Sequence, residues 1–466
     1  MERIFQSKRQ NGVLLLLSLV AIVAAWVLAS GMSRRSDMGN ELSKGAQVLE
    51  RRPTGSAQLV SIEPFPEMDG EMCQWTAASA SSTMAEALAQ ERMAALRAPA
   101  ADTGAEKSVV LDRNPARSIR DPNPSFSAIA VEPNTNMLAI TDENLFRVME
   151  YNRNDNTPPS SRMTEPKRVV GGNKTKAEMM CGVYIDPKTL DMYVVNNDTQ
   201  DWLSIFSKNA VGNVPPDRVL AVPHGTFGIA VDEGKEELFL TVQHNNEVIV
   251  YRKMAAGNEK PLRELYGDDT HLEDPHGVAL DTKNNLMFVT NHGSVSYRGK
   301  DAKGARGYER GSGKFGPPSI TVYHADAKGN TPPLRVISGP KTGLNWPMQV
   351  TLDEERGEIY VANDMDHSIE VFKTTDEGDV APTRIIKGPK TLVKNPTGVA
   401  LDLKNKEFWV ASMGNHTATV FPLDANGNVA PKRAIRGGPA DELSLMIGNP
   451  GAVGYDTKRD QILVPN

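Results

Sequence analysis

A proline followed two residues later by an arginine, and then after one residue by an apolar side chain, occurs seven times in this chain of 466 residues. The seven arginines are Arg117, Arg168, Arg218, Arg263, Arg335, Arg384 and Arg433. An apolar run that ends in an acidic residue also occurs seven times. Its acidic residues are Glu132, Asp186, Asp232, Asp281, Asp353, Asp402 and Asp456. A period of about 50 residues is typical of a repeat protein.

The two ends of this series are incomplete in opposite ways. Arg117 has no acid of the series before it, and Asp456 has no arginine of the Pro-x-Arg series after it. From Asp186 onward the acid usually precedes its arginine by 31 or 32 residues. A ring whose last unit is assembled from both chain ends explains both orphans. The pattern therefore predicts a closed circle of repeats.

Each unit contains four short apolar segments that alternate with polar residues and are separated by turn residues. In one unit these segments are 348–353, 359–363, 368–372 and 383–386. Four such strands, here called a to d from the axis outward, form an antiparallel meander with two apolar faces. Packing each sheet against its neighbours around an axis buries both faces, which is the β-propeller solution.

The sequence thus predicts an all-β fold, a seven-bladed β-propeller over residues 107–466. Its last blade would combine N-terminal c and d strands, near 108–111 and 116–119, with C-terminal a and b strands within 452–465.

The N-terminal region carries the signals of an exported protein. Residues 1–11 are basic, and residues 12–32 are uncharged and apolar over a length that can cross a bilayer as a helix. The basic tail predicts a cytoplasmic N-terminus. We expect residues 12–32 to be an uncleaved signal-anchor, with a cleaved signal peptide as the alternative. Either leaves the propeller outside the cytoplasm, in the periplasm or at the cell surface. Residues 33–106 are expected to form a linker with a short Ala-rich helix.

Charge and cysteine content exclude several classes of site. The net charge of -6 argues against a nucleic-acid-binding surface. Two cysteines, Cys73 and Cys181, cannot build a four-thiolate site, although one bridge between them stays open.

Several segments resemble the NHL and YVTN repeats of β-propeller proteins. The resemblance is carried by Pro275-His276-Gly277-Val278-Ala279-Leu280-Asp281, by Pro396-Thr397-Gly398-Val399-Ala400-Leu401-Asp402 and by Tyr360-Val361-Ala362-Asn363. It covers about residues 107–466 and implies the propeller fold. It does not fix an activity, because such propellers serve as binding platforms, lactonases and lyases.

The repeated acids and arginines are expected to be structural. An acid that ends strand a can accept hydrogen bonds from the a–b turn. An arginine on an outer strand can lie over an aromatic side chain of strand c, such as Phe372 or Tyr251, and donate to turn carbonyls.

Seven of the eight histidines fall in the d–a or b–c connections, which open on the same face of a propeller. Three converging imidazoles could hold zinc or another divalent metal. The candidate metal ligands are His224, His276 and His292. The alternative is that these are ordinary turn and solvated loop residues, and no cofactor is then expected.

Two further sets are candidates for ligand binding. Asn196, Asn291 and Asn363 occupy equivalent positions at the ends of three b strands, where they could contact a polar ligand or satisfy loop backbone groups. An insertion at 293–318 holds Arg298, Arg306 and Tyr308 and could act as a lid or dock an acidic partner. A solvated loop is the alternative.

No complete catalytic constellation is present, so the sequence favours a non-catalytic binding or scaffold module. Its partner would be a protein, peptide or glycan on the face that carries the histidines. The alternative is a metal-dependent hydrolase or lyase, lactonase-like, with a histidine site at the channel mouth.

Overall fold

The computed structural model describes residues 121–197, 200–294 and 316–445, together with Lys458 and six short strands outside these ranges. The chain separates into two units, residues 1–119 and 120–466. In the first unit, β1 (Ala57–Leu59) pairs with β2 (Leu111–Arg113). Residues 12–32 and the predicted Ala-rich helix lie outside the described residues. Among the residues that are described, no helix has the length and apolar character needed to span a membrane.

The second unit is dominated by four-stranded antiparallel sheets, each made from one continuous stretch of chain. The first blade contains β3 (Phe126–Glu132), β4 (Met137–Asp142), β5 (Arg147–Asn152) and β6 (Arg168–Gly171). The second contains β7 (Met180–Ile185), β8 (Met192–Asn196), β9 (Trp202–Phe206) and β10 (Arg218–Ala221). The third contains β11 (Thr226–Asp232), β12 (Glu237–Val242), β13 (Glu247–Arg252) and β14 (Arg263–Tyr266).

The remaining three blades repeat this plan. The fourth contains β15 (Pro275–Asp281), β16 (Leu286–Asn291), β19 (Ser319–His324) and β20 (Arg335–Ser338). The fifth contains β21 (Pro347–Asp353), β22 (Glu358–Asn363), β23 (Ser368–Lys373) and β24 (Arg384–Lys387). The sixth contains β25 (Pro396–Asp402), β26 (Glu407–Ser412), β27 (Thr417–Pro422) and β28 (Arg433–Arg436). The hairpin of β17 (Arg298–Lys300) and β18 (Arg306–Tyr308) lies within the insertion of the fourth blade.

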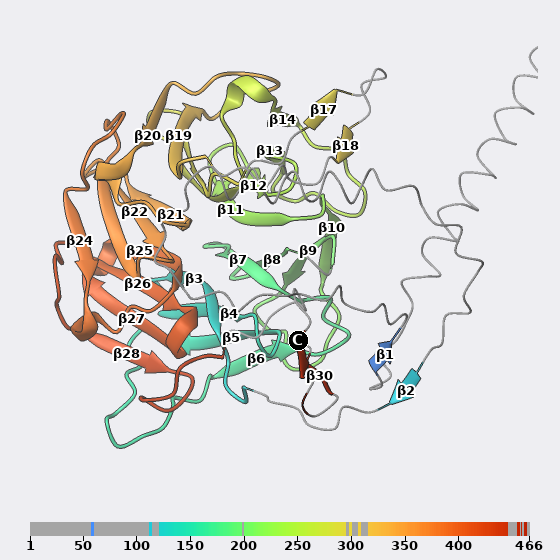
Figure 1. Cartoon of the computed structure of the whole chain (residues 1–466), viewed down its shortest axis with the longest axis vertical. Coiled ribbons are helices and arrows are strands. Elements are labelled where there is room, and N and C mark those ends of the chain that lie inside the picture. Colours follow the sequence, from blue (N-terminus) through green and yellow to red (C-terminus); the bar gives the residue numbers. More distant parts are fainter. Residues whose placement is uncertain are drawn as a thin grey trace, which may run out of the picture. The chain divides into compact units, whose positions relative to one another are not determined.

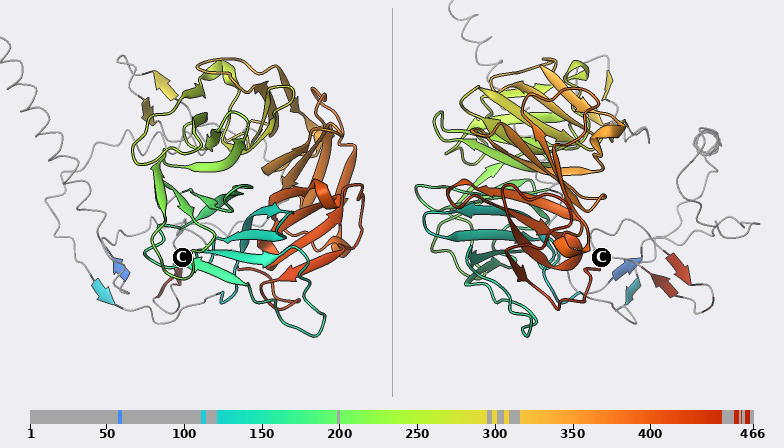
Figure 2. Two further views of the ribbon diagram at one scale, coloured as in Figure 1. Left: turned by 180° about the vertical axis from the view of Figure 1, so that it is seen from behind. Right: turned by 90° about the vertical axis from the view of Figure 1, so that its left-hand side faces the viewer.

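The six sheets form a closed ring, with β3, β7, β11, β15, β21 and β25 innermost (Figures 1 and 2). Closure joins the sixth blade to the first. Thr397 donates a hydrogen bond to the carbonyl oxygen of Ser127 at 2.6 Å, and one hydrophobic cluster contains both Trp409 and Phe126. Neighbouring sheets thus bury their apolar faces against each other, as the period-two pattern predicts.

The predicted propeller is confirmed, but the prediction of seven blades is wrong, because the described residues form six. Of the strands near those assigned to the seventh blade, β29 (Gly454–Asp456) and β30 (Gln461–Leu463) pair with each other, as predicted strands a and b would. The N-terminal β2 pairs with β1 instead of joining them. The physical reason is the direct contact of β25 with β3. A Cβ placed on Gly398 would lie 2.8 Å from the Ser127 carbonyl oxygen, so no sheet fits between these strands.

The repeated acids have the predicted structural role in all six blades. Each accepts hydrogen bonds from backbone N–H groups of the turn that follows its strand. Asp353, for example, accepts from the N–H groups of Glu355 and Arg356 at 3.0 and 3.1 Å. The a–b turn is therefore built by the acid at its start.

The arginines connect neighbouring blades. Arg218 donates to the carbonyl oxygen of Ala255, in the c–d connection of the next blade, at 2.7 Å. Equivalent bonds are made by Arg168, Arg263, Arg335, Arg384 and Arg433. The aromatic partner was predicted on strand c but is on strand b, as in the stacking of Arg218 over Tyr193 at 5.2 Å. In each sheet, strand c separates strand d from strand b. The long arginine side chain on strand d reaches across strand c to the aromatic ring on strand b.

Candidate functional site

In an antiparallel blade, the b–c and d–a connections emerge on the same side of the ring. This side is called the mouth face. It holds six equivalent positions, the first residue after each b strand: Glu143, Asn197, Gln243, His292, Asp364 and Met413. The backbone N–H of each donates a hydrogen bond to the carbonyl oxygen of the residue that directly precedes strand a of the same blade, at 2.8 to 3.2 Å. These six residues are named the rim.

A bulge lies near the start of every inner strand and changes the direction of the second residue. The second residues are Ser127, Cys181, Phe227, His276, Met348 and Thr397. Cys181, Phe227 and Met348 come from three different blades, yet they belong to one hydrophobic cluster. Apolar side chains from three blades therefore pack together beside the rim.

His276 and His292, which the sequence predicts as metal ligands, lie together in the fourth blade. Their rings stack with centroids 3.3 Å apart and an interplanar angle of 19°. Asp274 lies beside both, with carboxylate oxygens 3.8 Å from Nδ1 of each histidine. Burial raises the pKa of Asp274 to about 7 and lowers the pKa of His276 to about 3. Burial also holds the pKa of His292 well below its usual value, so both imidazoles are neutral.

His224, the third predicted metal ligand, is not part of this cluster. Its Nδ1 lies 3.1 Å from a carboxylate oxygen of Asp201, and its ring stacks on His244 at 5.4 Å. Asp274, which the histidine pattern missed, takes its place. The signal was present in the sequence, because Asp274 stands two residues before His276.

The three predicted asparagines are buried at the ends of their b strands. Their side chains bond the neighbouring connection: Asn196 accepts from the N–H of Glu178 at 2.8 Å, and Asn363 accepts from the N–H of Asn345 at 2.6 Å. Asn291 accepts from the N–H of Glu273 at 3.1 Å. This geometry fits the structural alternative weighed for them.

Arg298, Arg306 and Tyr308 lie in the hairpin that follows His292 in the chain. In this hairpin Arg298 pairs with Tyr308, and Arg306 pairs with Lys300. The insertion therefore begins at the rim, within the b–c connection of the fourth blade.

Carboxyl groups lie in the first and fifth blades of the rim. Burial raises the pKa of Glu143 to about 7, and Cys181 donates to its Oε1 at 3.3 Å. Burial also raises the pKa of Asp364, which accepts a hydrogen bond from Asn395 at 3.0 Å. The side chain of Cys181 is buried, and Cys73 lies outside the described residues.

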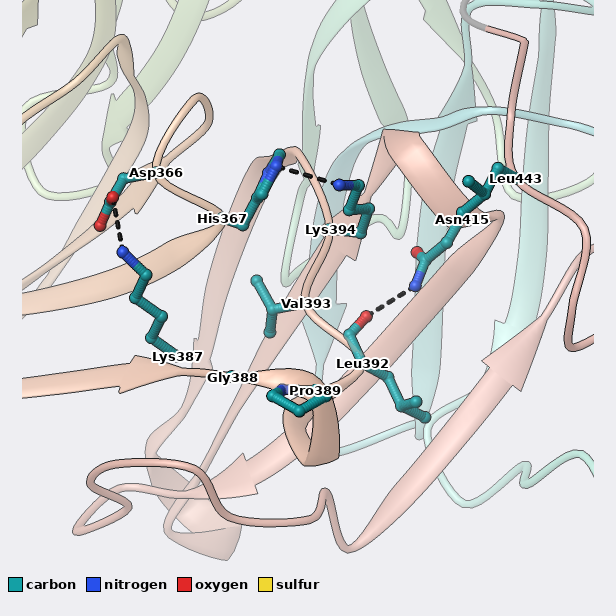
Figure 3. Close-up of a pocket in the computed structure, with 10 residues that line it drawn as sticks. All are labelled: Asp366, His367, Lys387, Gly388, Pro389, Leu392, Val393, Lys394, Asn415 and Leu443. Carbon is teal, nitrogen blue, oxygen red and sulfur yellow. Dashed lines mark hydrogen bonds and ion pairs between the residues drawn. The ribbon is translucent and has the colours of Figure 1, made fainter.

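A cavity of about 370 Å³ lies on the mouth face between the fifth and sixth blades (Figure 3). Its polar lining comes from Asp366, His367, Lys387, Lys394 and Asn415, and its apolar lining from Pro389, Leu392, Val393 and Leu443. Lys387 pairs with Asp366 at 2.6 Å. This cavity, which is named the groove, could not be predicted from the histidine pattern because its residues come from two blades.

Two donors meet in the groove without an acceptor between them. The backbone N–H of Asn395 donates to Nδ1 of His367 at 3.1 Å, so the ring proton of a neutral His367 must be on Nε2. Burial, and next the charge of Lys394, lower the pKa of His367 and keep it neutral. Lys394 Nζ lies 3.1 Å from this Nε2. A lysine ammonium has only donors, so an anion beside the pair would satisfy both.

Large exposed apolar side chains occur in one sector of the mouth face, and two of them, Leu392 and Leu443, line the groove. They are Phe146, Trp346, Met365, Leu392, Leu443 and Leu445. All six belong to mouth-face segments of the fifth, sixth and first blades. In the described parts of the second to fourth blades, no large hydrophobic residue that is exposed lies on this face. Trp346 is 46% exposed and packs on His292 at 5.0 Å, which connects the sector to the rim.

No family model matches the sequence, and no curated protein matches it. Solved structures with a similar arrangement include hydrazine synthase from Kuenenia stuttgartiensis, at 13% identity and a TM-score of 0.44, covering 66% of this chain and 98% of the other. A functionally unknown protein from Desulfotomaculum acetoxidans has 14% identity and a TM-score of 0.44, covering 68% and 89%. These values carry no inference about activity. No match confirms the NHL or YVTN resemblance, and the propeller assignment rests on the strand pairing.

Proposed function

We propose that this chain is a non-catalytic binding module that holds an acidic peptide segment of a partner protein in the groove between the fifth and sixth blades. The observation that carries this proposal is the approach of Lys394 Nζ to Nε2 of His367, two donors that lack a shared acceptor. A carboxylate placed there would accept from both and would form a charge-assisted hydrogen bond with the lysine.

The apolar surroundings favour a peptide over a glycan. Leu392 and Leu443 are exposed at the groove, and Met365 and Trp346 lie in neighbouring connections of the fifth blade. Contiguous exposed apolar surface with a polar border is typical of protein interaction sites. The ligand would therefore carry an acidic group next to one or more apolar side chains.

We also propose that the module acts outside the cytoplasm and is tethered through residues 12–32. The support is sequence alone: an uncharged apolar stretch after a basic tail. Protease added to spheroplasts should then digest the propeller while leaving a cytoplasmic control protein intact. Protection of the propeller in spheroplasts would contradict export.

Peptide selection tests the groove. A random peptide library is selected against the full chain and counter-selected against Lys394→Glu. The enriched peptides should contain Asp, Glu or a free C-terminal carboxylate beside apolar residues. A synthetic copy of an enriched peptide should lose about tenfold or more in affinity with Leu392→Asp or Lys394→Ala.

Leu262→Asp is the matched control, because Leu262 is an exposed leucine in a c–d connection on the opposite face. It should bind the peptide as tightly as the unmodified chain. Equal binding by Leu392→Asp, or enrichment of peptides with no acidic group, would contradict the proposal.

A second candidate function is metal-assisted hydrolysis or elimination. The grouping of Asp274, His276 and His292 favours it, because three such ligands can hold a metal that activates water. It predicts hydrolysis of simple ester or lactone substrates that depends on added metal and is lost in His292→Ala. Unchanged background rates in the presence of metal would remove this candidate.

A further inference from the structure

The fourth blade holds a cluster of three side chains that can coordinate a metal, and it is the only such cluster found in the described part of the chain. One ligand atom from each of Asp274, His276 and His292 lies within 4.8 Å of the other two. Asp274 directly precedes β15 and His292 directly follows β16. Because Pro275 pairs with Asn291, the sheet itself places these positions side by side.

The spacing of the three groups suits one ion between them. The carboxylate oxygens of Asp274 lie 3.8 Å from Nδ1 of His276 and 3.8 Å from Nδ1 of His292. These distances are too long for hydrogen bonds. With metal–ligand bonds of about 2.0–2.2 Å, two ligand atoms on one ion stand roughly 3–4 Å apart.

We propose that Asp274, His276 and His292 form a binding site for a divalent transition metal of the zinc class. Two imidazoles and one carboxylate suit zinc and its first-row neighbours, whereas calcium and magnesium favour sites made of oxygen ligands. Three protein ligands leave at least one coordination position for water or another small ligand.

Metal binding requires a local rearrangement of the histidines. The lone pairs of an imidazole lie in its ring plane, and the two rings are stacked at 3.3 Å, so one ring must turn for both nitrogens to reach the same ion. Nδ1 of His276 now lies 2.8 Å from the carbonyl oxygen of Asp274 and must give up this hydrogen bond to bind the metal. The metal therefore opens the stack.

Neighbouring side chains orient the ligands from outside the cluster. Nε2 of His276 lies against the side-chain amide of Gln243. Nε2 of His292 lies 3.1 Å from Met348 Sδ. Contacts of this kind hold the rings of metal-binding histidines in place, and their loss typically weakens metal binding.

The metal site does not depend on peptide binding in the groove. The second candidate function would need this metal site, but the site can exist without any catalysis. The test therefore measures binding of the ion itself.

Equilibrium dialysis of the full chain, purified without a histidine tag, measures metal content with Zn²⁺ or Co²⁺ as the probe. One equivalent should bind. His276→Ala, His292→Gln and Asp274→Asn should each weaken binding by about tenfold or more. In the unmodified chain, excess Zn²⁺ should raise the melting temperature, because it binds only the folded state. The same Zn²⁺ concentration should raise the melting temperature of Asp274→Asn by less, because a tenfold weaker site gives less stabilisation.

His224→Ala is the matched control, since this histidine lies outside the cluster and should retain one equivalent of Zn²⁺. The melting curve recorded without metal shows whether each variant is folded, and Asp274→Asn keeps the size of the side chain. The proposal is overturned if the unmodified chain binds no stoichiometric Zn²⁺, if folded Asp274→Asn binds as tightly, or if Ca²⁺ competes equally.

Discussion

Arg433 in the sixth blade donates a hydrogen bond from Nε to the backbone carbonyl oxygen of Arg153 in the first blade, at 3.3 Å. The same guanidinium pairs with Glu407 at 2.7 Å and lies 5.8 Å from the centre of the Trp409 ring. The five equivalent arginines join consecutive blades. Arg433 alone among them joins blades that are far apart in the sequence, so it closes the ring.

Arg433→Ala should therefore destabilise the propeller by about 2 kcal/mol, because it removes a charged hydrogen bond and leaves the buried Glu407 with weaker compensation. Chemical denaturation measures the change. Arg252→Ala is the control, since its pair with Glu259 is at the surface and should make no measurable contribution. An Arg433→Ala protein that unfolds at the same denaturant concentration as the parent would rule out this role.

Removal of residues 452–466 should leave the unfolding free energy of the ring unchanged within error. The ring closes through Thr397 and Ser127 and not through β29 and β30, which pair with each other. Denaturation curves of the truncated and complete chains should overlay. A large loss of stability would show that the C-terminal hairpin belongs to the closure after all.

The sequence was sufficient for the repeat unit but not for the number of units. Each repeated acid marks an a–b turn and each repeated arginine marks a d strand. These local patterns were enough to predict the four-stranded blade and its turns. Gly398 stands at a repeated position of the inner strand, but the pattern does not say which strand it contacts, and the structure shows that its neighbour is Ser127 of the first blade. Counting Asp456 as the start of a blade therefore gave one blade too many.

The candidate sites were predictable to the extent that they are local in sequence. His276 and His292 flank one strand pair, so their meeting followed from the blade itself. His224 belongs to the neighbouring blade, and its partner Asp201 could not be chosen without coordinates. The groove joins His367 and Lys394 across two blades, which is a tertiary relationship.

Gly228→Ala should be strongly destabilising, by about 3 kcal/mol or more, because the inner strands approach closely at this point. A Cβ on Gly228 would lie 2.2 Å from the carbonyl oxygen of His276, which is backbone and cannot move aside alone. Gly257→Ala is the matched control: its Cβ would meet nothing within 4 Å, so only its left-handed φ of +60° opposes the change, at roughly 1–2 kcal/mol. Thermal unfolding of both variants compares them, and equal melting temperatures would contradict the packing argument.

Glu370→Gln should change how stability depends on pH. Glu370 is buried, and burial, followed by the charge of Asp366, raises its pKa from 4.5 to about 8. Its Oε1 accepts a hydrogen bond from Asn363 at 3.0 Å, which a glutamine can preserve. Between the two pKa values the folded state holds a proton that the unfolded chain releases, so the stability of the parent falls as pH rises from about 4.5 to about 8.

The variant lacks this titration, so its advantage over the parent should grow across that interval and level off above about pH 8. Each tenfold difference in proton affinity corresponds to about 1.4 kcal/mol, which makes the full effect measurable by urea denaturation. Glu355→Gln, at an exposed position, controls for the loss of one negative charge. If the difference between Glu370→Gln and the parent were constant from about pH 4 to about pH 8, the carboxyl would titrate alike in both states. The buried Glu370 would then have to be ionised in the folded protein, with a partner for its charge.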